Sequence, residues 1–262
     1  MSDRIRVFIG SGEASLVERK VAIYSLRKHT KRDLDIYVFN GTHNAIEIND
    51  QDPIPAPMSL KIKYQNITEF SLYRYLIPQI CSYQGRAIYI DSDTVCLSDI
   101  SELFEADLGE NDFLAKREAA DIWGLSIMLI DCKKCRFDLE MYCSEINQKL
   151  YGYFDFSQMN SRFLQYHPFS IAELDPRWNQ FDSYDAETKL IHYTNLYTQP
   201  WKAKNHPFGE LWFQYFNEAL EAGILTERDI ELSILRSYVR PDIQQGNFSK
   251  KSLRSLLKKL LR

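Results

Sequence analysis

Short runs of β-forming residues alternate with longer helical patterns along most of the chain, an order that indicates a sheet covered by helices. We predict strands at residues 6–10, 35–40, 86–90, 112–116, 126–131 and 189–193. We predict helices at residues 15–29, 68–80, 138–149, 155–166 and 208–222. The predicted fold class is therefore α/β, with a mixed, mostly parallel sheet flanked by helices.

The length and composition are those of one folded domain. The chain has 262 residues, of which 45% are hydrophobic and 26% charged, as is usual for a globular protein with a large core. No apolar run approaches the roughly 20 residues that a membrane-spanning helix needs. Charged residues also interrupt the first thirty positions, where a signal peptide would lie. We expect a single domain over residues 1–248, either cytoplasmic or peripheral on the inner face of the cytoplasmic membrane.

The C-terminal tail differs from the rest of the chain in charge. The whole chain has a net charge of −4, and residues 249–262 carry +6 with no acidic residue, which leaves −10 on residues 1–248. So acidic a body argues against nucleic acid as a partner. In the tail, leucines recur at helical spacing, at positions 253, 256, 257, 260 and 261. This pattern predicts a basic amphipathic helix that binds an anionic membrane surface or docks on the acidic body.

The five cysteines do not suit a disulfide framework, because their number is odd. Cys132 and Cys135 have the CxxC spacing that occurs in zinc and redox sites. No second CxxC or CxxH pair stands nearby to complete a tetrahedral zinc site. We interpret the pair as small buried thiols at the end of a strand.

Two carboxylates follow a predicted buried strand. Residues 86–90 form a short apolar run, and Asp91 and Asp93 come directly after it. In an extended backbone, residues i and i+2 point to the same side, so both carboxylates can face one cation. Open α/β sheets bind ligands at this edge, and hard cations such as Mn²⁺ or Mg²⁺ bridge carboxylates to phosphate oxygens. The alternative interpretation is that the two aspartates cap a turn.

Several blocks around this pair, taken in order, resemble glycosyltransferase family 8. They are residues 70–75, 87–93, 99–103, 126–131, 176–179, 191–194 and 199–202. With weaker matches the resemblance covers about residues 5–215. Family 8 enzymes are retaining glycosyltransferases of the GT-A fold that use UDP-glucose or UDP-galactose and need Mn²⁺. The resemblance therefore implies a GT-A type fold, a UDP-sugar donor and a divalent metal cofactor.

The resemblance also implies roles for particular residues. Asp91 and Asp93 match the metal-binding carboxylates, and His192 matches the histidine that completes the ligand set for Mn²⁺ or Mg²⁺. Arg74 matches an arginine that pairs with these carboxylates or reaches the sugar nucleotide. Asp155 matches an acid that contacts the donor sugar, although an acid there also suits the first turn of a helix. We assign Arg74 and Asp155 as catalytic residues.

The nucleotide is expected at the end of the first strand. Ile9, Gly10 and Ser11 match the family's uracil and ribose site, and a glycine lets the backbone approach a ligand closely. Ser92, between the two aspartates, is assigned to cofactor binding as well. Lys202 is the candidate for the diphosphate, because Gln199 stands where the family has a lysine.

The chain departs from the family near the sugar. Phe156 replaces a glutamine next to the reacting face, Asn195 replaces a glycine, and residues 124–126 replace an Asn-x-Gly sequence. These changes leave the predicted metal and nucleotide sites intact but make the identity of the donor sugar open.

These patterns predict a metal-dependent, retaining transfer of a hexose, glucose or galactose, from a UDP-sugar to a glycan or glycolipid acceptor, as in lipopolysaccharide biosynthesis. Because Phe156 cannot act as a nucleophile, we expect same-face attack, with the departing phosphate taking the proton of the acceptor hydroxyl. One alternative is a non-catalytic protein that binds sugar nucleotides or glycans. Another alternative is a nucleotidyltransferase. The lack of a basic residue at positions 10–13 argues against this second alternative.

Overall fold

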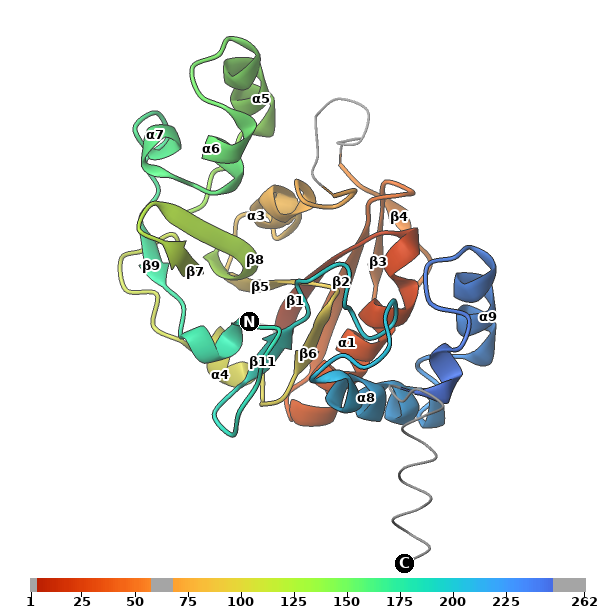
Figure 1. Ribbon diagram of the computed structural model, residues 1–262. Coiled ribbons are helices and arrows are strands. Elements are labelled where there is room, and N and C mark those ends of the chain that lie inside the picture. The colour runs from red at the N-terminus through yellow and green to blue at the C-terminus, as the bar shows by residue number, and fades with distance from the viewer. Residues whose placement is uncertain (1–3, 58–67, 247–262) are drawn as a thin grey trace, which may run out of the picture.

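The computed structural model describes residues 4–57 and 68–246. Figure 1 shows a central sheet with helices packed around it and a helical projection, α5 to α7, beyond the β7–β9 side. The basic tail predicted at residues 249–262 lies outside the described residues, so its helix and its membrane contact stay predictions. Among the described helices, none is both long and apolar enough to span a bilayer.

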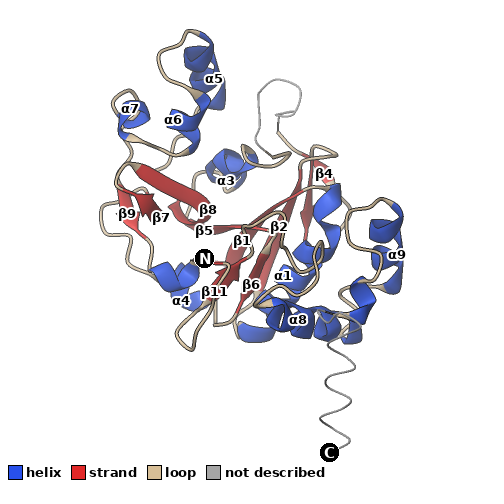
Figure 2. Ribbon diagram, in the orientation of Figure 1, coloured by secondary structure: helices blue, strands red, loops and turns tan. Residues whose placement is uncertain are grey.

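Within the described residues, eight strands form the main sheet in the order β4-β3-β2-β1-β5-β8-β7-β9 (Figure 2). Their bounds are Ile5–Ser11 (β1), Leu34–Asn40 (β2), Ala45–Ile48 (β3), Ile54–Pro55 (β4), Arg86–Asp91 (β5), Phe113–Ala119 (β7), Ile122–Asp131 (β8) and Ile171–Glu173 (β9). At the centre, β1 pairs in parallel with β2 and β5. The β7–β9 pair is also parallel, and the remaining pairs are antiparallel. The predicted α/β class with a mixed sheet is confirmed.

A second, small sheet holds the parts of the site together. Its strands are Gln180–Phe181 (β10), Leu190–His192 (β11) and Thr94–Cys96 (β6), in the order β10-β11-β6. β6 and β11 are antiparallel, and their register pairs Thr94 with His192. This pairing joins the turn after β5 to a residue almost one hundred positions later in the chain.

The helices of the described segments have the following bounds: Leu16–His29 (α1), Ile77–Ile80 (α3), Ser101–Phe104 (α4), Leu139–Asn147 (α5), Tyr153–Ser157 (α6), Ser161–Leu164 (α7), Gly209–Glu221 (α8) and Glu227–Leu235 (α9). Short 3₁₀ turns lie at Glu13–Ser15, Tyr73–Leu76, Pro176–Trp178 and Ile243–Gln245. α1 packs against β6, α8 and α9. It thereby ties the small sheet to the C-terminal helices.

The core lies on both faces of the main sheet. Along β5, Ala87 and Tyr89 belong to one hydrophobic cluster, and Ile88 and Ile90 belong to the cluster on the opposite face. This alternation follows from the two-residue period of a strand. Both faces of β5 are covered, which explains why its sequence is a continuous apolar run. The buried strand holds its C-terminal end in place, where the two aspartates begin.

The two cysteine thiols at the end of β8 are buried, as predicted. Cys132 and Cys135 are both 0% exposed and belong to the same hydrophobic cluster. Burial raises the pKa of Cys135 above its ordinary value, which disfavours the reactive thiolate. The interpretation of this pair as packing residues therefore holds.

Two predicted helices differ from those observed. Residues 68–80 form the 3₁₀ turn Tyr73–Leu76 and then the short α3. Pro78 lies in the first turn of α3, where the backbone N–H that proline lacks would have no partner within the helix. Residues 155–166 form two helices, α6 and α7, because Met159 has a positive φ of 47° and Asn160 then caps α7. The strands β3, β4, β6, β9 and β10 and the helices α4 and α9 were not predicted.

Candidate active site

Three side chains with metal-binding atoms converge at the carboxyl end of β5. Asp91 is the last residue of β5, Asp93 follows in the turn to β6, and His192 ends β11. Each offers one ligand atom, and these atoms all lie within 4.8 Å of one another. The pairing of Thr94 with His192 holds the imidazole beside the turn. The structure thus brings together the three residues predicted as metal ligands.

Asp91 is held by two neighbouring side chains. The hydroxyl of Tyr89, on the same side of β5, donates to Asp91 Oδ1 at 2.6 Å. Arg74 Nη2 lies 3.4 Å from that oxygen, and its guanidinium stacks over the Tyr89 ring, 4.5 Å from the centroid. Desolvation raises the pKa of Asp91, and Arg74 opposes this rise. A further positive charge would therefore stabilise the carboxylate.

An irregularity in β8 supplies the group that anchors Arg74. The pairing of β7 with β8 skips residues 125–127, which frees their backbone groups from this ladder. The carbonyl oxygen of Leu125 accepts a hydrogen bond from Arg74 Nη1, and that of Ser71 accepts one from Nε at 2.9 Å. Arg74 is only 9% exposed. It is therefore a fixed, buried charge beside Asp91 and not a solvent-facing residue.

A chain of hydrogen bonds orients His192. Its Nε2 lies 2.9 Å from Asp93 Oδ1, and its Nδ1 lies 3.1 Å from Asn179 Oδ1. The amide nitrogen of Asn179 donates to Ser126 Oγ at 3.0 Å. This donation leaves Asn179 Oδ1 to accept from the Nδ1–H of His192, so Nε2 is directed at the site. Burial lowers the pKa of His192, but the adjoining Asp93 outweighs it and raises that pKa.

Gln199 replaces the lysine of the family pattern and contacts the site directly. Its amide nitrogen donates to Asp93 Oδ2 at 3.1 Å and to the carbonyl oxygen of Tyr193 at 2.8 Å. Its side-chain oxygen is buried and has no partner among the described residues. The amide therefore positions Asp93 without adding the positive charge that a lysine would bring.

The sequence reasoning missed Glu18, an acidic residue near the site. It lies in the first turn of α1, is 5% exposed, and has one carboxylate oxygen without a hydrogen-bond partner. Burial raises its pKa to about 7, and the negative charge of Asp93 adds to the rise, whereas Lys202 opposes it. The sequence did contain a signal for this buried acid: Glu18 lies amid the apolar face of a predicted helix, beside Val17 and Val21.

The residues predicted to hold the nucleotide are mostly buried. Ser11 is 0% exposed and Ser92 is 2% exposed, and the backbone N–H of Ser92 donates to the carbonyl oxygen of Gly10 at 3.1 Å. A Cβ atom at Gly10 would lie 2.1 Å from the Tyr89 hydroxyl, so this position needs glycine. Ile9 is buried in the sheet, while Lys202 is exposed near Glu18. Their contacts with a nucleotide stay predictions.

Asp155 lies at the start of α6. Its carboxylate accepts from the backbone N–H of Gly152 at 2.6 Å and from the Asn160 amide at 2.7 Å. The hydrogen bonds from Gly152 and Asn160 lower the pKa of Asp155. Phe156, the next residue, is 0% exposed and packs in the core. Asp155 therefore stabilises the N-terminus of α6. Its contact with the donor sugar stays a prediction.

A cavity of about 270 Å³ opens beside Arg74 and Asp91, at the end of β5. Among the residues that line it are Arg74, Asp91, Glu118, Trp123, Phe154 and Gln158. A guanidinium, carboxylates, an amide and aromatic rings at one cavity are the groups that bind hydroxyls and the apolar faces of sugars.

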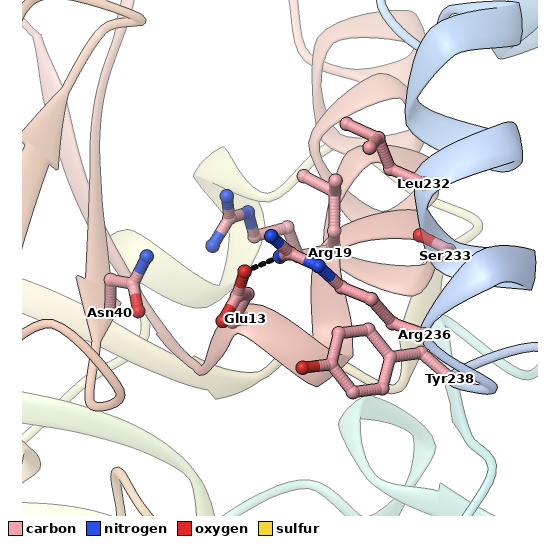
Figure 3. A pocket seen from close by; sticks show the side chains of 8 residues that line it. Glu13, Arg19, Asn40, Leu232, Ser233, Arg236 and Tyr238 are labelled. Atoms are coloured by element: carbon pink, nitrogen blue, oxygen red, sulfur yellow. Dashed lines mark ion pairs between the residues drawn. The ribbon is translucent and has the colours of Figure 1, made fainter.

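A smaller cavity of about 90 Å³ lies between α1, the end of β2 and α9. Figure 3 shows Arg236 in an ion pair with Glu13, with the Arg19 guanidinium beside them. Arg19 Nη1 also donates to Ser11 Oγ at 3.4 Å. The residues after α9 therefore help to fix the loop that follows β1, the strand whose end was assigned to the nucleotide.

Comparison with known proteins identifies the family. The model of glycosyl transferase family 8 matches residues 7–157, more than half of the chain. The chain belongs to glycosyltransferase family 8. The glycosyltransferase GlyE of Streptococcus pneumoniae is 34% identical to it over 80 residues, which are 29% of this chain and 20% of that protein. This family 8 chain thus spans only a fifth of its curated relative.

Solved structures show the same fold. The apo structure of GlyE from Streptococcus pneumoniae has a TM-score of 0.57 at 21% identity, covering 85% of this chain and 64% of its own. The galactosyltransferase LgtC, solved with donor and acceptor sugar analogues, has a TM-score of 0.60 at 15% identity, with coverage of 84% and 99%. The bifunctional glycosyltransferase WbbM has a TM-score of 0.59 at 17% identity, covering 88% of this chain and 51% of its own. The GT-A type fold is confirmed.

Glu18 yields a prediction about stability and pH. The folded-state pKa of about 7 exceeds the ordinary 4.5, so wild-type stability is lost as pH rises through this interval. Glu18→Gln should raise the unfolding free energy of metal-free protein by about 2 to 4 kcal/mol at pH 8, and by less than about 1 kcal/mol at pH 5. Urea unfolding at both pH values, with a chelator present, measures the difference.

The matched control for this change is Glu210→Gln. Glu210 is an exposed acid in the first turn of α8, so its substitution should change stability little at either pH. Equal stabilisation by Glu18→Gln at pH 5 and pH 8 would contradict the raised pKa.

Proposed function

We propose that this family 8 protein transfers a hexose from a UDP-sugar to a glycan or glycolipid acceptor, with retention of configuration and with a divalent cation. The observation that carries the proposal is the convergence of Asp91, Asp93 and His192 within 4.8 Å, in a chain that matches the family model. LgtC is described as a galactosyltransferase, which supports a hexose donor by analogy. Glucose and galactose both remain candidates.

The side chains present suit Mn²⁺ or Mg²⁺. Two carboxylate oxygens and one imidazole nitrogen are ligands that Mn²⁺ accepts, and Mg²⁺ would rely on the oxygens. Asn179 fixes the imidazole so that Nε2 faces Asp93. When bound, the cation would act as a Lewis acid on the donor diphosphate. Asp91 would join it while keeping its hydrogen bond from Tyr89.

Positive side chains would stabilise the leaving group. Arg74 is anchored by the Leu125 carbonyl and lines the cavity beside Asp91, so its charge is already in place before the donor arrives. Lys202 is exposed near Glu18, where its ammonium group can turn toward a diphosphate. Same-face attack fits this arrangement, because the departing phosphate oxygen would accept the proton of the acceptor hydroxyl. Asp155 would contact a sugar hydroxyl as an ionised acceptor.

A second candidate is a protein of the same fold that binds sugar nucleotides without turnover. Two observations favour it: Gln199 supplies no positive charge, and Phe156 is buried in the core where the family has a glutamine beside the sugar. A nucleotidyltransferase is disfavoured by the family match.

A UDP-release assay over UDP-glucose, UDP-galactose and UDP-N-acetylglucosamine tests the proposal. Release should require Mn²⁺ or Mg²⁺ and should fall at least about a hundredfold in Asp93→Asn, because a ligand is lost. The control is Asp52→Asn, which should keep wild-type activity. Asp52 is exposed in the loop between β3 and β4, at the edge of the main sheet. Metal-dependent binding of a UDP-sugar without release would instead support the non-catalytic candidate.

The basic tail supports a separate proposal, peripheral attachment to an anionic membrane. Six basic residues within residues 249–262 would each contribute about 1 kcal/mol near such a surface. Full-length protein should therefore sediment with vesicles containing phosphatidylglycerol at low salt, and a variant lacking residues 249–262 should not. Unchanged sedimentation after the deletion would rule out the tail as the anchor.

A further inference from the structure

A cavity of about 650 Å³ lies at the end of the main sheet opposite to Asp91. Its wall includes Arg6, the second residue of β1, and Arg86, the first residue of β5, whereas Asp91 is the last residue of β5. We propose that this cavity is a second binding site, in which Arg6 and Arg86 hold a small organic phosphate ester. Such a site goes beyond the proposed function and does not depend on it, because the metal ligands lie at the other end of β5.

The parallel pairing of β1 with β5 brings the two arginines to one place. The register of these strands pairs Val7 with Ile88. Arg6 and Arg86 come shortly before that pair, so both lie at the N-terminal ends of adjacent strands. Arg6 Nη2 also donates to the carbonyl oxygen of Arg86 at 2.9 Å. Two guanidinium groups therefore reach the same cavity from adjacent strands.

The charges of these two guanidinium groups are not balanced by a carboxylate. Among the residues that the structure describes, neither Arg6 nor Arg86 forms an ion pair. Their partners are backbone carbonyl oxygens. Arg6 Nη2 donates to that of Gln84 at 2.6 Å, and Arg86 Nη1 donates to those of Phe104 and Ala106 at 3.2 and 3.1 Å. A guanidinium has five N–H donors, so each arginine keeps donors and a full charge for an anion.

The cavity wall as a whole is positively charged. Its third arginine, Arg4, is paired with Asp35, the acid among the lining residues, at 3.0 Å. Residues 1–248 carry −10, so a positive wall here stands out from an acidic body and would attract anions locally. The pKa of Cys81, which lines the cavity, is lowered by a hydrogen bond with Cys132 and further by the positive charge of Arg6, against the effect of burial.

A strained turn holds Arg6 in position. Ser82, Tyr83 and Gly85 have positive φ values of 52°, 55° and 66°. This conformation is unfavourable for serine and tyrosine, and such strain is concentrated at sites that hold ligands. A Cβ atom at Gly85 would lie 2.6 Å from Arg6 Nη2, so the glycine leaves room for the guanidinium. The turn thus fixes the cationic group before a ligand arrives, which lowers the cost of binding.

The size and the apolar part of the wall indicate more than an inorganic ion. Ile80 of α3 and Phe104 of α4 line the cavity, and they pack against clusters on opposite faces of the main sheet. The cavity therefore crosses the N-terminal edge of the sheet. Small-molecule sites usually have about 300 to 1,000 Å³, and guanidinium groups match the oxygens of a phosphate. A phosphate group with a small organic part suits both features.

Calorimetric titration of the full-length protein tests this site, with a chelator present so that no metal holds phosphate. The probes are phenyl phosphate, inorganic phosphate and phenol. Phenyl phosphate should bind at least about threefold more tightly than inorganic phosphate, because Ile80 and Phe104 would contact its ring. Phenol, which has no phosphate group, should not saturate the site. Arg6→Gln and Arg86→Gln should each raise the Kd for phenyl phosphate about tenfold or more, because charged hydrogen bonds are lost.

Three further variants separate this site from general charge effects. Arg228→Gln removes an arginine of α9 whose side chain is 74% exposed, and it should leave the Kd unchanged. Lys202→Gln removes the cation assigned to the nucleotide and should also leave the Kd unchanged. Arg86→Lys keeps the positive charge but loses the paired donors, so its Kd should lie between those of wild type and Arg86→Gln.

Thiol alkylation locates the ligand in the wild-type protein, without any substitution. Cys81 lines the cavity, whereas Cys143 lies in α5 and serves as the internal control. At a phenyl phosphate concentration of about ten times the Kd, alkylation of Cys81 by iodoacetamide should slow about tenfold, because about a tenth of the sites stay open. Alkylation of Cys143 should not change. Mass spectrometry of the digested protein measures both rates.

Several results would overturn this site. They are no saturable binding of phenyl phosphate to the wild type, phenol binding as tightly as phenyl phosphate, and equal protection of Cys81 and Cys143. A loss of binding in Lys202→Gln, with Arg6→Gln and Arg86→Gln like wild type, would instead place the phosphate at the nucleotide site. Because no readout involves UDP release, failure here leaves the proposed function untouched, and failure of the proposed function leaves this site untouched.

Discussion

The site depends on one pairing, that of β6 with β11. This two-strand contact sets Thr94 opposite His192 and so places an imidazole beside a turn that lies almost one hundred residues earlier in the chain. Without it, Asp91 and Asp93 would be two carboxylates at the end of a strand, with no third ligand. α1 reinforces the pairing because it packs against β6 and against the helices that follow β11.

Burial and neighbouring charges shift the pKa values of the acidic and basic groups around the site. Desolvation raises the pKa of Asp91 and of Glu18, the latter to about 7, and Asp93 raises the pKa of His192. Each shift means that the group holds its proton more tightly than in water, because of burial at Asp91 and Glu18 and because of Asp93 at His192. A divalent cation would favour the deprotonated forms of the ligands, so metal binding would release protons.

The residues around the three ligands act through geometry. Ser126, Asn179 and His192 form one chain of hydrogen bonds, and a skipped stretch of β8 provides both Ser126 and the carbonyl group that holds Arg74. The same pair of strands, further along, directs Glu118 into the cavity. One irregular β7–β8 ladder therefore contributes to the metal side and to the sugar side of the site.

The sequence was sufficient for the parts that depend on local patterns. The short apolar run of residues 86–90 predicted a buried strand, and the two-residue period of an extended backbone predicted Asp91 and Asp93 on one side. The role of His192 came only from the family resemblance, because nothing local links it to that strand. The hydrogen bonds of Asn179, the contact of Gln199 and the burial of Glu18 were beyond prediction, since each depends on packing between distant segments. α6 and α7 were merged because their apolar spacing continues through Met159.

The most direct test of the account is pulsed electron paramagnetic resonance of Mn²⁺ bound to the protein with UDP. The account predicts a ¹⁴N coupling from a directly ligated imidazole, which should vanish in His192→Gln while the ³¹P coupling from the diphosphate persists. Asp91→Asn and Asp93→Asn should each weaken Mn²⁺ binding in the same samples. Tight Mn²⁺ binding with no nitrogen coupling, or with coupling unchanged in His192→Gln, would contradict the proposed metal site.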